Sequence, residues 1–187
     1  MGKLIVYNFV TLNGYFKGPN DDISWAKSGS KEEQEFAAGN LKSESTLLFG
    51  RVTYEMMAGY WPTAAAQKND PAVAEGMNKA EKIVFSRTLK KVEWNNTRIV
   101  KDNIGEEIKK MKQMPRKDMT LLGSGSIVTQ FAELGLIDEY QIMVHPVVIG
   151  NGTPILKDIK QKLNLKLTST KTFKNGIVLL CYTPVKN

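Results

Sequence analysis

The sequence has little of what disulfide-bonded, metal-binding or membrane proteins need. It contains one cysteine, Cys181, and one histidine, His145, so an intramolecular disulfide is impossible and we expect no metal site. No apolar run approaches the length that spans a bilayer, and the first residues, Met1-Gly2-Lys3, lack the pattern of a secretory signal peptide. We therefore expect a cytoplasmic protein with no membrane partner. A lone histidine in an apolar strand is more often structural than catalytic.

The composition is that of an ordinary globular protein with a basic surface. With 187 residues, of which 42% are hydrophobic and 24% charged, the chain is expected to form one domain over residues 1–187. The net charge of +7 raises the possibility of a nucleic-acid partner. However, the basic residues are spread along the chain, and the densest groups, 109–112 and 157–166, have no interleaved aromatic residues for base stacking. We expect no nucleic-acid partner, but a surface that attracts anionic small molecules.

Strand and helix patterns alternate up to Gly135, which favours an α/β sheet with crossover helices. A capping box of Ser30 and Glu33 predicts a helix that extends to about Ser43. Beyond Ile137 the pattern becomes extended, and Asn175-Gly176 predicts a hairpin turn in an antiparallel region. The remaining expected elements are strands at 3–10, 46–49, 81–85, 97–100 and 119–122, helices at 51–58, from 71, at 104–114 and at 126–134, and loops at 11–30 and 62–70.

Two short segments have the same pattern, an apolar strand that runs into glycine and then into a helix. The first is Leu47-Leu48-Phe49-Gly50-Arg51-Val52-Thr53, and the second is Leu121-Leu122-Gly123-Ser124-Gly125-Ser126-Ile127. Each offers backbone N–H groups at the positive end of a helix dipole, where phosphates bind. One such turn is weak evidence, since it can be a plain strand-to-helix connection. Two in one small domain favour a ligand with several phosphates, such as a dinucleotide.

The residues around these turns indicate which dinucleotide. Arg51 can bind phosphate through its guanidinium fork, and Thr53 offers a hydroxyl in the first helical turn. The segment from Gly123 lacks the third glycine of a Rossmann fingerprint, and no acidic residue follows about twenty positions later to hold a ribose hydroxyl. Ser86 and Arg87 end the strand at 81–85, at the sheet edge where ligands bind. Arginines without the ribose-binding acid favour NADP over NAD.

The ordered set of motifs resembles the dihydrofolate reductase-like family, and within it the branch similar to the reductase domain of bacterial riboflavin biosynthesis. The resemblance covers nearly the whole chain. The segments that carry it are Thr11-Leu12-Asn13-Gly14-Tyr15, 47–55, 83–87, 123–127 and 137–152. It implies a three-layer α/β fold, with a central mixed and mostly parallel sheet, helices on both faces and a C-terminal antiparallel hairpin.

The resemblance also implies NADPH as cofactor and assigns residues to it. Gly50, Arg51 and Thr53 would contact the diphosphate and the 2′-phosphate, and Ser86 and Arg87 would lie by the adenosine. The turn of Gly123, Ser124, Gly125, Ser126 and Ile127 would hold the diphosphate. Val10 and Thr11 would border the nicotinamide, together with Asn13, which is also placed at the substrate. Trp25 and Trp61 can stack on a planar substrate or pack in the core.

The sequence departs from the family pattern on the substrate side. The position of the acidic residue on the first helix of dihydrofolate reductases is Gln34 here, between Glu33 and Glu35, which argues against dihydrofolate. The riboflavin enzymes usually carry aspartate where Asn13 stands and an acidic residue where Leu122 stands. The zinc-binding cysteines of the associated deaminase domain are absent. We expect an NADPH-dependent reductase of a small planar heterocycle, present as a homodimer. The alternative is a nucleotide-binding module without turnover.

Overall fold

The fold is built on one sheet of eight strands in the order β5-β4-β3-β6-β1-β7-β10-β9. The computed structural model describes residues 1–26, 30–41, 45–114 and 117–185. The strands from β5 to β7 pair in parallel, whereas β10 pairs antiparallel to both β7 and β9. The strands are β1 (Leu4–Thr11), β2 (Tyr15–Lys17), β3 (Thr46–Gly50), β4 (Lys82–Phe85), β5 (Thr97–Val100), β6 (Met119–Leu122), β7 (Glu139–His145), β8 (Thr153–Pro154), β9 (Leu165–Thr172) and β10 (Val178–Pro184).

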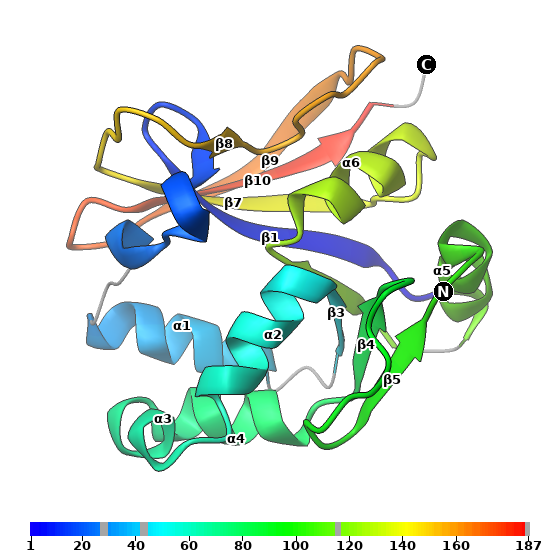
Figure 1. Ribbon diagram of the computed structural model, residues 1–187. Coiled ribbons are helices and arrows are strands. Elements are labelled where there is room, and N and C mark those ends of the chain that lie inside the picture. The colour runs from blue at the N-terminus through cyan, green and yellow to red at the C-terminus, as the bar shows by residue number, and fades with distance from the viewer. Residues whose placement is uncertain (27–29, 42–44, 115–116, 186–187) are drawn as a thin grey trace.

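Helices cover both faces of this sheet, as Figure 1 shows. Four of them, α1 (Lys31–Leu41), α2 (Arg51–Tyr60), α3 (Ala64–Asn69) and α4 (Pro71–Lys79), lie on one side, and α5 (Ile104–Gln113) and α6 (Gly125–Glu133) lie on the other. Two short 3₁₀ helices, η1 (Pro19–Asp21) and η2 (Ser24–Ala26), follow β2. Strands β2 and β8 form a separate small antiparallel sheet. The predicted three-layer α/β fold is confirmed.

Local sequence signals explain where several elements begin and end. The hydroxyl of Ser30 accepts the backbone N–H of Glu33 at 3.3 Å, so Ser30 caps the start of α1 as predicted. The Glu33 carboxylate accepts the Ser30 hydroxyl at 2.7 Å, whereas in a capping box it accepts the backbone N–H of the N-cap residue. Ser43, the predicted end of this helix, lies outside the described residues. The turn after β9 has Gly176 at φ +87°, and the backbone N–H of Gly176 donates to the carbonyl of Phe173 at 2.9 Å. This is the predicted hairpin.

Two of the predicted loops contain regular structure. Residues 11–30 include β2, η1 and η2, because Tyr15–Lys17 pairs with β8, and residues 62–70 contain α3. The hydroxyl of Thr63 accepts the N–H of Ala66 at 3.2 Å, and the alanines that follow this cap favour helix strongly enough to form a short one after Pro62. Asn103 occupies the N-cap position of α5. However, its backbone is left-handed, with φ 52°, and its side chain makes no capping hydrogen bond.

The core divides along the two faces of the sheet. On the α5 and α6 side, Leu4, Val6, Leu121 and Phe131 belong to a cluster of fully buried side chains. On the other side, residues of β3 and β4 pack against α1, α2 and α4, and a third cluster around Phe173 lies between the C-terminal strands and α1. Within the part of the chain that the structure describes, no helix combines the length and the apolar character needed to cross a membrane.

Candidate cofactor and substrate site

The two glycine turns lie side by side. Strand β3 ends at Gly50 and its parallel neighbour β6 ends at Leu122, so α2 and α6 begin at the same edge of the sheet. The backbone N–H of Gly50 donates to the hydroxyl of Ser124 at 2.7 Å, and the N–H of Ser124 donates to the hydroxyl of Thr53 at 3.1 Å. These bonds cross between the turns. They join the two helix N-termini into one continuous edge. The Gly50 N–H is one of the donors in these bonds, so it already has an acceptor.

The second turn requires its glycines for conformation and for space. Gly123 has φ +55°, and a Cβ there would lie 3.1 Å from the side chain of Thr53. Ser124 follows with φ 59°, in the left-handed region. A Cβ at Gly125 would lie 2.8 Å from the ring of Phe16, which therefore packs against the first residue of α6. Phe16 is a contact that the sequence did not reveal, because β2 is distant from this turn along the chain.

The N-termini of α2 and α6 differ from those of α1 and α5. Helices α1 and α5 carry acidic residues in their first turns, Glu32 and Glu33 in one and Glu106 and Glu107 in the other. Neither α2 nor α6 has an acidic residue there, and neither has a side-chain hydrogen bond at its N-cap. Acidic residues and caps satisfy the positive end of a helix. The two helix starts that meet at the glycine turns lack both, which suits them to bind an external anion.

Two arginines extend the same edge. Gly50 and Phe85 are register partners in β3 and β4, so Arg51 and Ser86 follow adjacent strand ends. Arg51 forms an ion pair with Glu55 at 2.9 Å, and Arg87 forms one with Asp102 at 3.2 Å; the side chains of both pairs are well exposed. The hydroxyl of Ser86 accepts the backbone N–H of Leu89 at 3.0 Å and organises the turn after β4. A phosphate at this edge would compete with the two carboxylates for the arginines.

The end of β1 is held by its own polar side chains. The hydroxyl of Thr11 donates to the Asn13 side-chain oxygen at 2.8 Å and accepts the N–H of Tyr15 at 3.0 Å. The amide of Asn13 donates to the carbonyl of Ile149 at 2.8 Å, which ties this turn to the segment after β7. Val10 is buried. The predicted roles of Val10 and Thr11 toward the cofactor, and of Asn13 toward the substrate, stay predictions.

A cavity of about 440 Å³ begins at the glycine turns and runs between the sheet and helices α1, α2 and α4. At the end near the turns it is lined by Asn8, Phe16, Thr53 and Gly123. The volume lies within the range of small-molecule sites. Asn8 was missed from the sequence, although a polar residue inside an apolar strand is a usable signal. It is buried, and its side-chain amide donates to the carbonyl of Gly123 at 3.1 Å.

Titratable groups lie at and near the cavity. Burial raises the pKa of Tyr7, which lines the cavity, well above its usual value, and the charge of Glu33 adds to this effect. Burial lowers the pKa of His145, and Glu33 acts in the opposite direction. Near neutral pH the tyrosine therefore keeps its proton. Of the two acids beside Gln34, Glu33 is the one that acts on these groups, whereas Glu35 is exposed and pairs with Lys31.

The two candidate stacking residues have separate positions. Trp61 lines the cavity, and its indole N–H points to the sulfur of Met57 at 3.1 Å. Trp25 packs edge-on against His145, with ring centroids 5.5 Å apart. The Trp25 indole nitrogen and the Nε2 of His145 are both buried without a hydrogen-bond partner. The predicted substrate contact of Trp25 stays a prediction, and the structure places Trp61, not Trp25, among the described lining residues.

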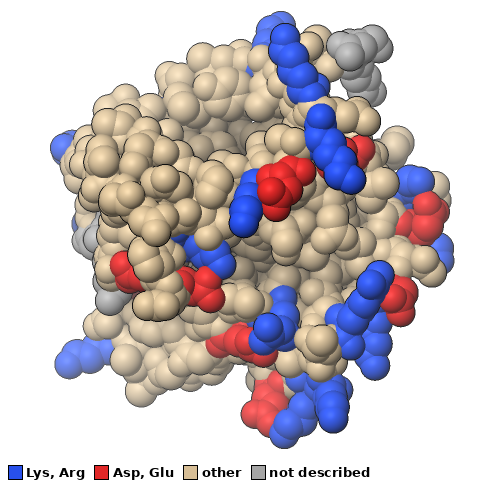
Figure 2. Space-filling model, turned by 45° about the horizontal axis from the view of Figure 1, so that its top comes forward, with Lys and Arg blue, Asp and Glu red and all other residues tan. Residues whose placement is uncertain are grey.

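The basic residues are spread over the surface. On the face that Figure 2 shows, lysine and arginine side chains lie at the top, right, bottom and left margin, several of them next to acidic ones, and an area at the upper left carries no charge. Among the residues that the structure describes, no group of three or more histidine, cysteine, aspartate or glutamate side chains is arranged to hold a metal ion.

Comparisons with known proteins identify relatives over nearly the whole chain. The family model described as the RibD C-terminal domain matches residues 2–179. Two proteins of Bacillus subtilis (strain 168) are similar in sequence. Uncharacterized protein YyaP is 34% identical in an alignment that includes 96% of this chain and 94% of YyaP. Uncharacterized protein YwjB is 23% identical in an alignment that includes 95% of each chain.

Solved structures share the fold at low sequence identity. A putative riboflavin biosynthesis protein from Shewanella sp. PV-4 has a TM-score of 0.75 at 17% identity, with 98% of this chain and 99% of that one covered. A diaminohydroxyphosphoribosylaminopyrimidine deaminase/5-amino-6-(5-phosphoribosylamino)uracil reductase from Thermotoga maritima has a TM-score of 0.68 at 14% identity, with 98% of this chain and 57% of that one covered. The fold, the paired glycine turns and the family match agree, and the chain belongs to the RibD C-terminal domain family.

Proposed function

We propose that this protein is an NADPH-dependent reductase of a small planar heterocycle. The family and its solved relatives support a reductase of the kind found in riboflavin biosynthesis. The observation that carries the cofactor assignment is the meeting of two helix N-termini that lack both a cap and an acidic first turn, joined by the hydrogen bonds between Gly50, Ser124 and Thr53. Such an edge is suited to the diphosphate of a dinucleotide.

The residues present fit this cofactor. The first-turn N–H groups of α2 and those of Gly125 and Ser126 on α6 would hold the diphosphate, because a helix leaves such groups without an internal partner. The N–H of Ile127 donates to the Ser124 carbonyl at 2.8 Å. Arg51 and Arg87, on adjacent strand ends, would hold the 2′-phosphate. The cavity that begins beside Thr53 and Gly123 would take the nicotinamide and the substrate together. When bound, NADPH supplies the hydride for the reduction.

The chain itself would position the substrate and exclude water. The apolar walls of the cavity keep the reacting groups away from solvent, and the sheet provides a rigid surface under the substrate. A tyrosine hydroxyl is protonated near neutral pH, and burial raises the pKa of Tyr7 further, so it can donate a hydrogen bond to a carbonyl or ring nitrogen of the substrate.

The cofactor assignment predicts a preference for NADPH over NADH that depends on the two arginines. Each charge-assisted contact contributes about 1.5–3 kcal/mol, so the preference should be roughly tenfold or more. Titration of wild type, Arg51→Ala and Arg87→Ala with both cofactors measures it. We expect weaker NADPH binding in each variant with little change for NADH. Unchanged discrimination in both variants would remove the assignment.

The ion pair of Arg51 with Glu55 allows a test in the opposite direction. Glu55→Gln releases the arginine from its partner at 2.9 Å, so NADPH should bind about two- to fivefold more tightly while NADH does not change. Glu75→Gln on α4 is the matched control, since it removes one exposed carboxylate elsewhere. An equal gain in both variants would indicate a general charge effect in place of a released arginine.

Turnover separates a reductase from the alternative, a module that binds NADP without catalysis. A panel of pterins and aminopyrimidines, followed by NADPH absorbance, should contain at least one compound that is reduced. NADPH binding with no oxidation across the panel would favour the module.

We also propose a homodimer, since β9 forms an exposed sheet edge that includes Leu167 at 48% exposure. Light scattering, which measures the molar mass in solution, tests this.

A further inference from the structure

Trp61, in the wall of the cavity, is held by a hydrogen bond from another helix. It is the residue that follows α2, and it lines the cavity. A helix leaves its last carbonyl groups without an internal donor. The carbonyl of Trp61 stands at such a position and accepts the side-chain amide of Asn78, on α4, at 2.9 Å. The end of α2 is therefore attached to a helix that comes later in the chain.

The partners of Asn78 fix the orientation of its amide. Its oxygen accepts the indole N–H of Trp94 at 2.7 Å, while its nitrogen donates to the Trp61 carbonyl. A carbonyl can only accept and an indole N–H can only donate, so the reversed amide would lose both hydrogen bonds. Trp94 is buried, and it packs against Phe49 and Tyr54 with ring centroids 6.0 and 6.2 Å apart. The amide is thus anchored on a buried aromatic cluster.

The backbone of Asn78 is held as well. The ammonium of Lys82 donates to its carbonyl at 3.2 Å and to that of Met77 at 2.9 Å. Asn78 is therefore bound through both ends of its side chain and through its backbone. The indole N–H of Trp61, in contrast, points to the sulfur of Met57 at 3.1 Å, which is a weak acceptor on a flexible side chain. The bond from Asn78 is the stronger of the two side-chain hydrogen bonds that hold Trp61.

We propose that Asn78 is a positioning residue for the substrate: it fixes the place of Trp61, whose indole stacks on the planar ring of the substrate. Aromatic pairs prefer particular offsets and tilts, so a ring that moves loses part of the attraction. Asn78 is not among the lining residues that the structure describes, and its effect on the substrate passes through Trp61. The inference rests on the proposed reductase function, because it concerns the ring that this reductase would bind.

Asn78→Asp breaks the contact with almost no change of shape. The carboxylate still accepts the Trp94 N–H, but it has no donor for the Trp61 carbonyl and repels it. The probes are pterin and 5,6-diaminouracil, and equilibrium dialysis measures their affinities. For the probe that binds wild type more tightly, we expect about five- to tenfold weaker binding and an unchanged affinity for NADPH. Equal probe affinities in wild type and Asn78→Asp, or no binding of either probe to wild type, would overturn the proposal.

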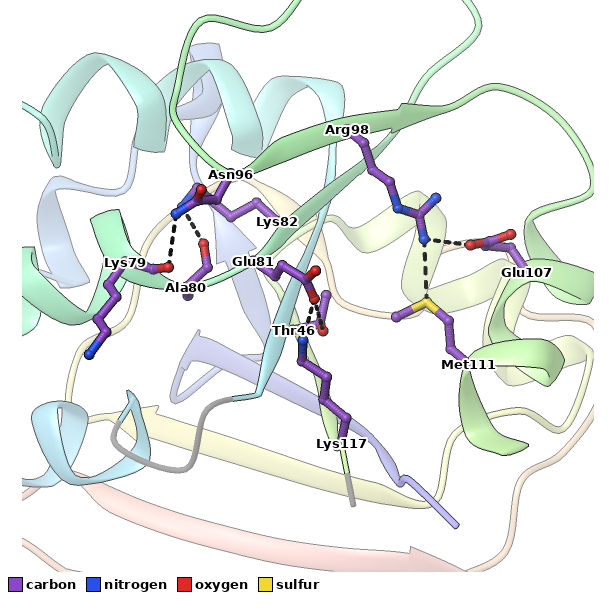
Figure 3. A network of polar contacts seen from close by, with 10 residues as sticks. All are labelled: Thr46, Lys79, Ala80, Glu81, Lys82, Asn96, Arg98, Glu107, Met111 and Lys117. Carbon is purple, nitrogen blue, oxygen red and sulfur yellow. Dashed lines mark hydrogen bonds and ion pairs between the residues drawn. The ribbon is translucent and has the colours of Figure 1, made fainter. Parts of the chain in front are cut away.

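Asn96→Gly is the matched control. Asn96 also donates its side-chain amide to a carbonyl of α4, that of Lys79 at 3.0 Å, as Figure 3 shows. Glycine suits the left-handed backbone at this position, where φ is 57°. The variant removes an amide from the same helix end, and the probe affinity should change by less than about twofold. Equal losses in Asn78→Asp and Asn96→Gly would indicate a general loosening of α4 and overturn the positioning role.

A double variant tests whether Asn78 acts through Trp61. Trp61→Ala removes the stacking ring and should weaken probe binding by about tenfold. If Asn78 acts only by positioning this ring, Asn78→Asp should cause no further loss in the Trp61→Ala protein. Additive losses would overturn the proposed route from Asn78 to the substrate.

The Trp61 ring can also be observed directly. In protein that contains 5-fluorotryptophan, the fluorine NMR signal of Trp61 is the one that disappears in Trp61→Ala. This signal should shift or broaden in Asn78→Asp and stay in place in Asn96→Gly. An unchanged Trp61 signal in Asn78→Asp would overturn the proposal.

Parallel titrations with NADPH separate this inference from the proposed function. NADPH binding combined with equal probe affinities in wild type and Asn78→Asp would defeat the inference and leave the reductase proposal intact. A selective loss of probe binding in Asn78→Asp, in a protein that does not bind NADPH, would support the positioning role and defeat the reductase proposal alone.

Discussion

The two faces of the central sheet are built differently, although the same strands supply both. On the α5 and α6 face, Leu4, Val6 and Leu121 are completely buried in a continuous core. On the other face, their neighbours Ile5, Tyr7 and Leu122 line the cavity. Because alternate residues of a strand point to opposite faces, one short sequence can contribute to stability on one side and to binding on the other. The difference suggests that stability and binding can be changed separately.

Adjacent leucines of β6 provide the largest test of this comparison. Leu121→Ala removes a completely buried side chain from the core and should lower the free energy of unfolding by about 2–5 kcal/mol. Leu122→Ala removes the same atoms from a half-buried side chain at the cavity and should cost about 1 kcal/mol. Urea denaturation of both variants measures the two costs. Equal losses would contradict the division between a packed face and a binding face.

Lys82, a buried lysine on the cavity side of the sheet, provides the second test of the comparison. The ammonium of Lys82 donates to the carbonyls of Met77 at 2.9 Å, Asn78 at 3.2 Å and Ala80 at 2.6 Å, so it binds the C-terminal end of α4. It also lies 4.6 Å from the ring centre of Trp94. Figure 3 shows Lys82 among Lys79, Ala80 and Asn96 at this end of the sheet. Helix α4, which lines one wall of the cavity, is therefore held to β4 by the ammonium group of Lys82 as well as by apolar contacts.

Replacement of this lysine should destabilise the fold and change its response to pH. Lys82→Met leaves the carbonyls without their donor and should cost about 1–3 kcal/mol, whereas Lys79→Met, exposed on the same helix, should cost little. Burial lowers the pKa of Lys82 to about 8, from 10.5. Between these values the unfolded chain holds more protons, so the stability of wild type should rise with pH relative to Lys82→Met. A constant difference between wild type and Lys82→Met from pH 7.5 to 10 would contradict this.

The sequence predicts best what a few neighbouring residues determine. The glycine turns, the helix cap at Ser30 and the hairpin at Gly176 are short patterns, and the structure contains all three. The alternation of elements predicted a parallel sheet, but the order of its strands came from the structure. The helix at 64–69 was missed because Pro62 and Asp70 suggested a loop, although Thr63 and the alanines after it favour a cap and a helix.

Contacts between distant segments were beyond reach of the sequence. The ring of Phe16 against Gly125, and the row of Leu122, Tyr7 and Gln141 across β6, β1 and β7, depend on strand register and on the path of β2. The hydrogen bond that engages the Gly50 N–H with Ser124 also depends on the pairing of β3 with β6. The sequence therefore indicated the residues of the proposed cofactor edge, whereas the cavity beside it emerged only from the packed structure.

The smallest expected effect concerns the buried His145 at the end of β7, which packs against the rings of Phe9 and Trp25. Burial lowers the pKa of His145, so below about pH 6.5 the unfolded chain takes up a proton that the folded chain refuses. The free energy of unfolding should therefore fall as the pH decreases, by at most about 1.4 kcal/mol per pH unit from this group. His145→Leu should lose this part of the acid sensitivity, as measured by urea denaturation at pH 7.5 and 5.5.

A second variant separates the histidine from other acid-sensitive groups. Glu33 opposes the effect of burial on His145, and its carboxylate also accepts a hydrogen bond from Asn175 at 2.9 Å. In Glu33→Gln the histidine should resist protonation to still lower pH, so its contribution to acid destabilisation should extend further than in wild type. If His145→Leu and wild type lose stability equally between pH 7.5 and 5.5, the acid response belongs to other groups, and the cavity side of the sheet is no more sensitive to acid than the packed side.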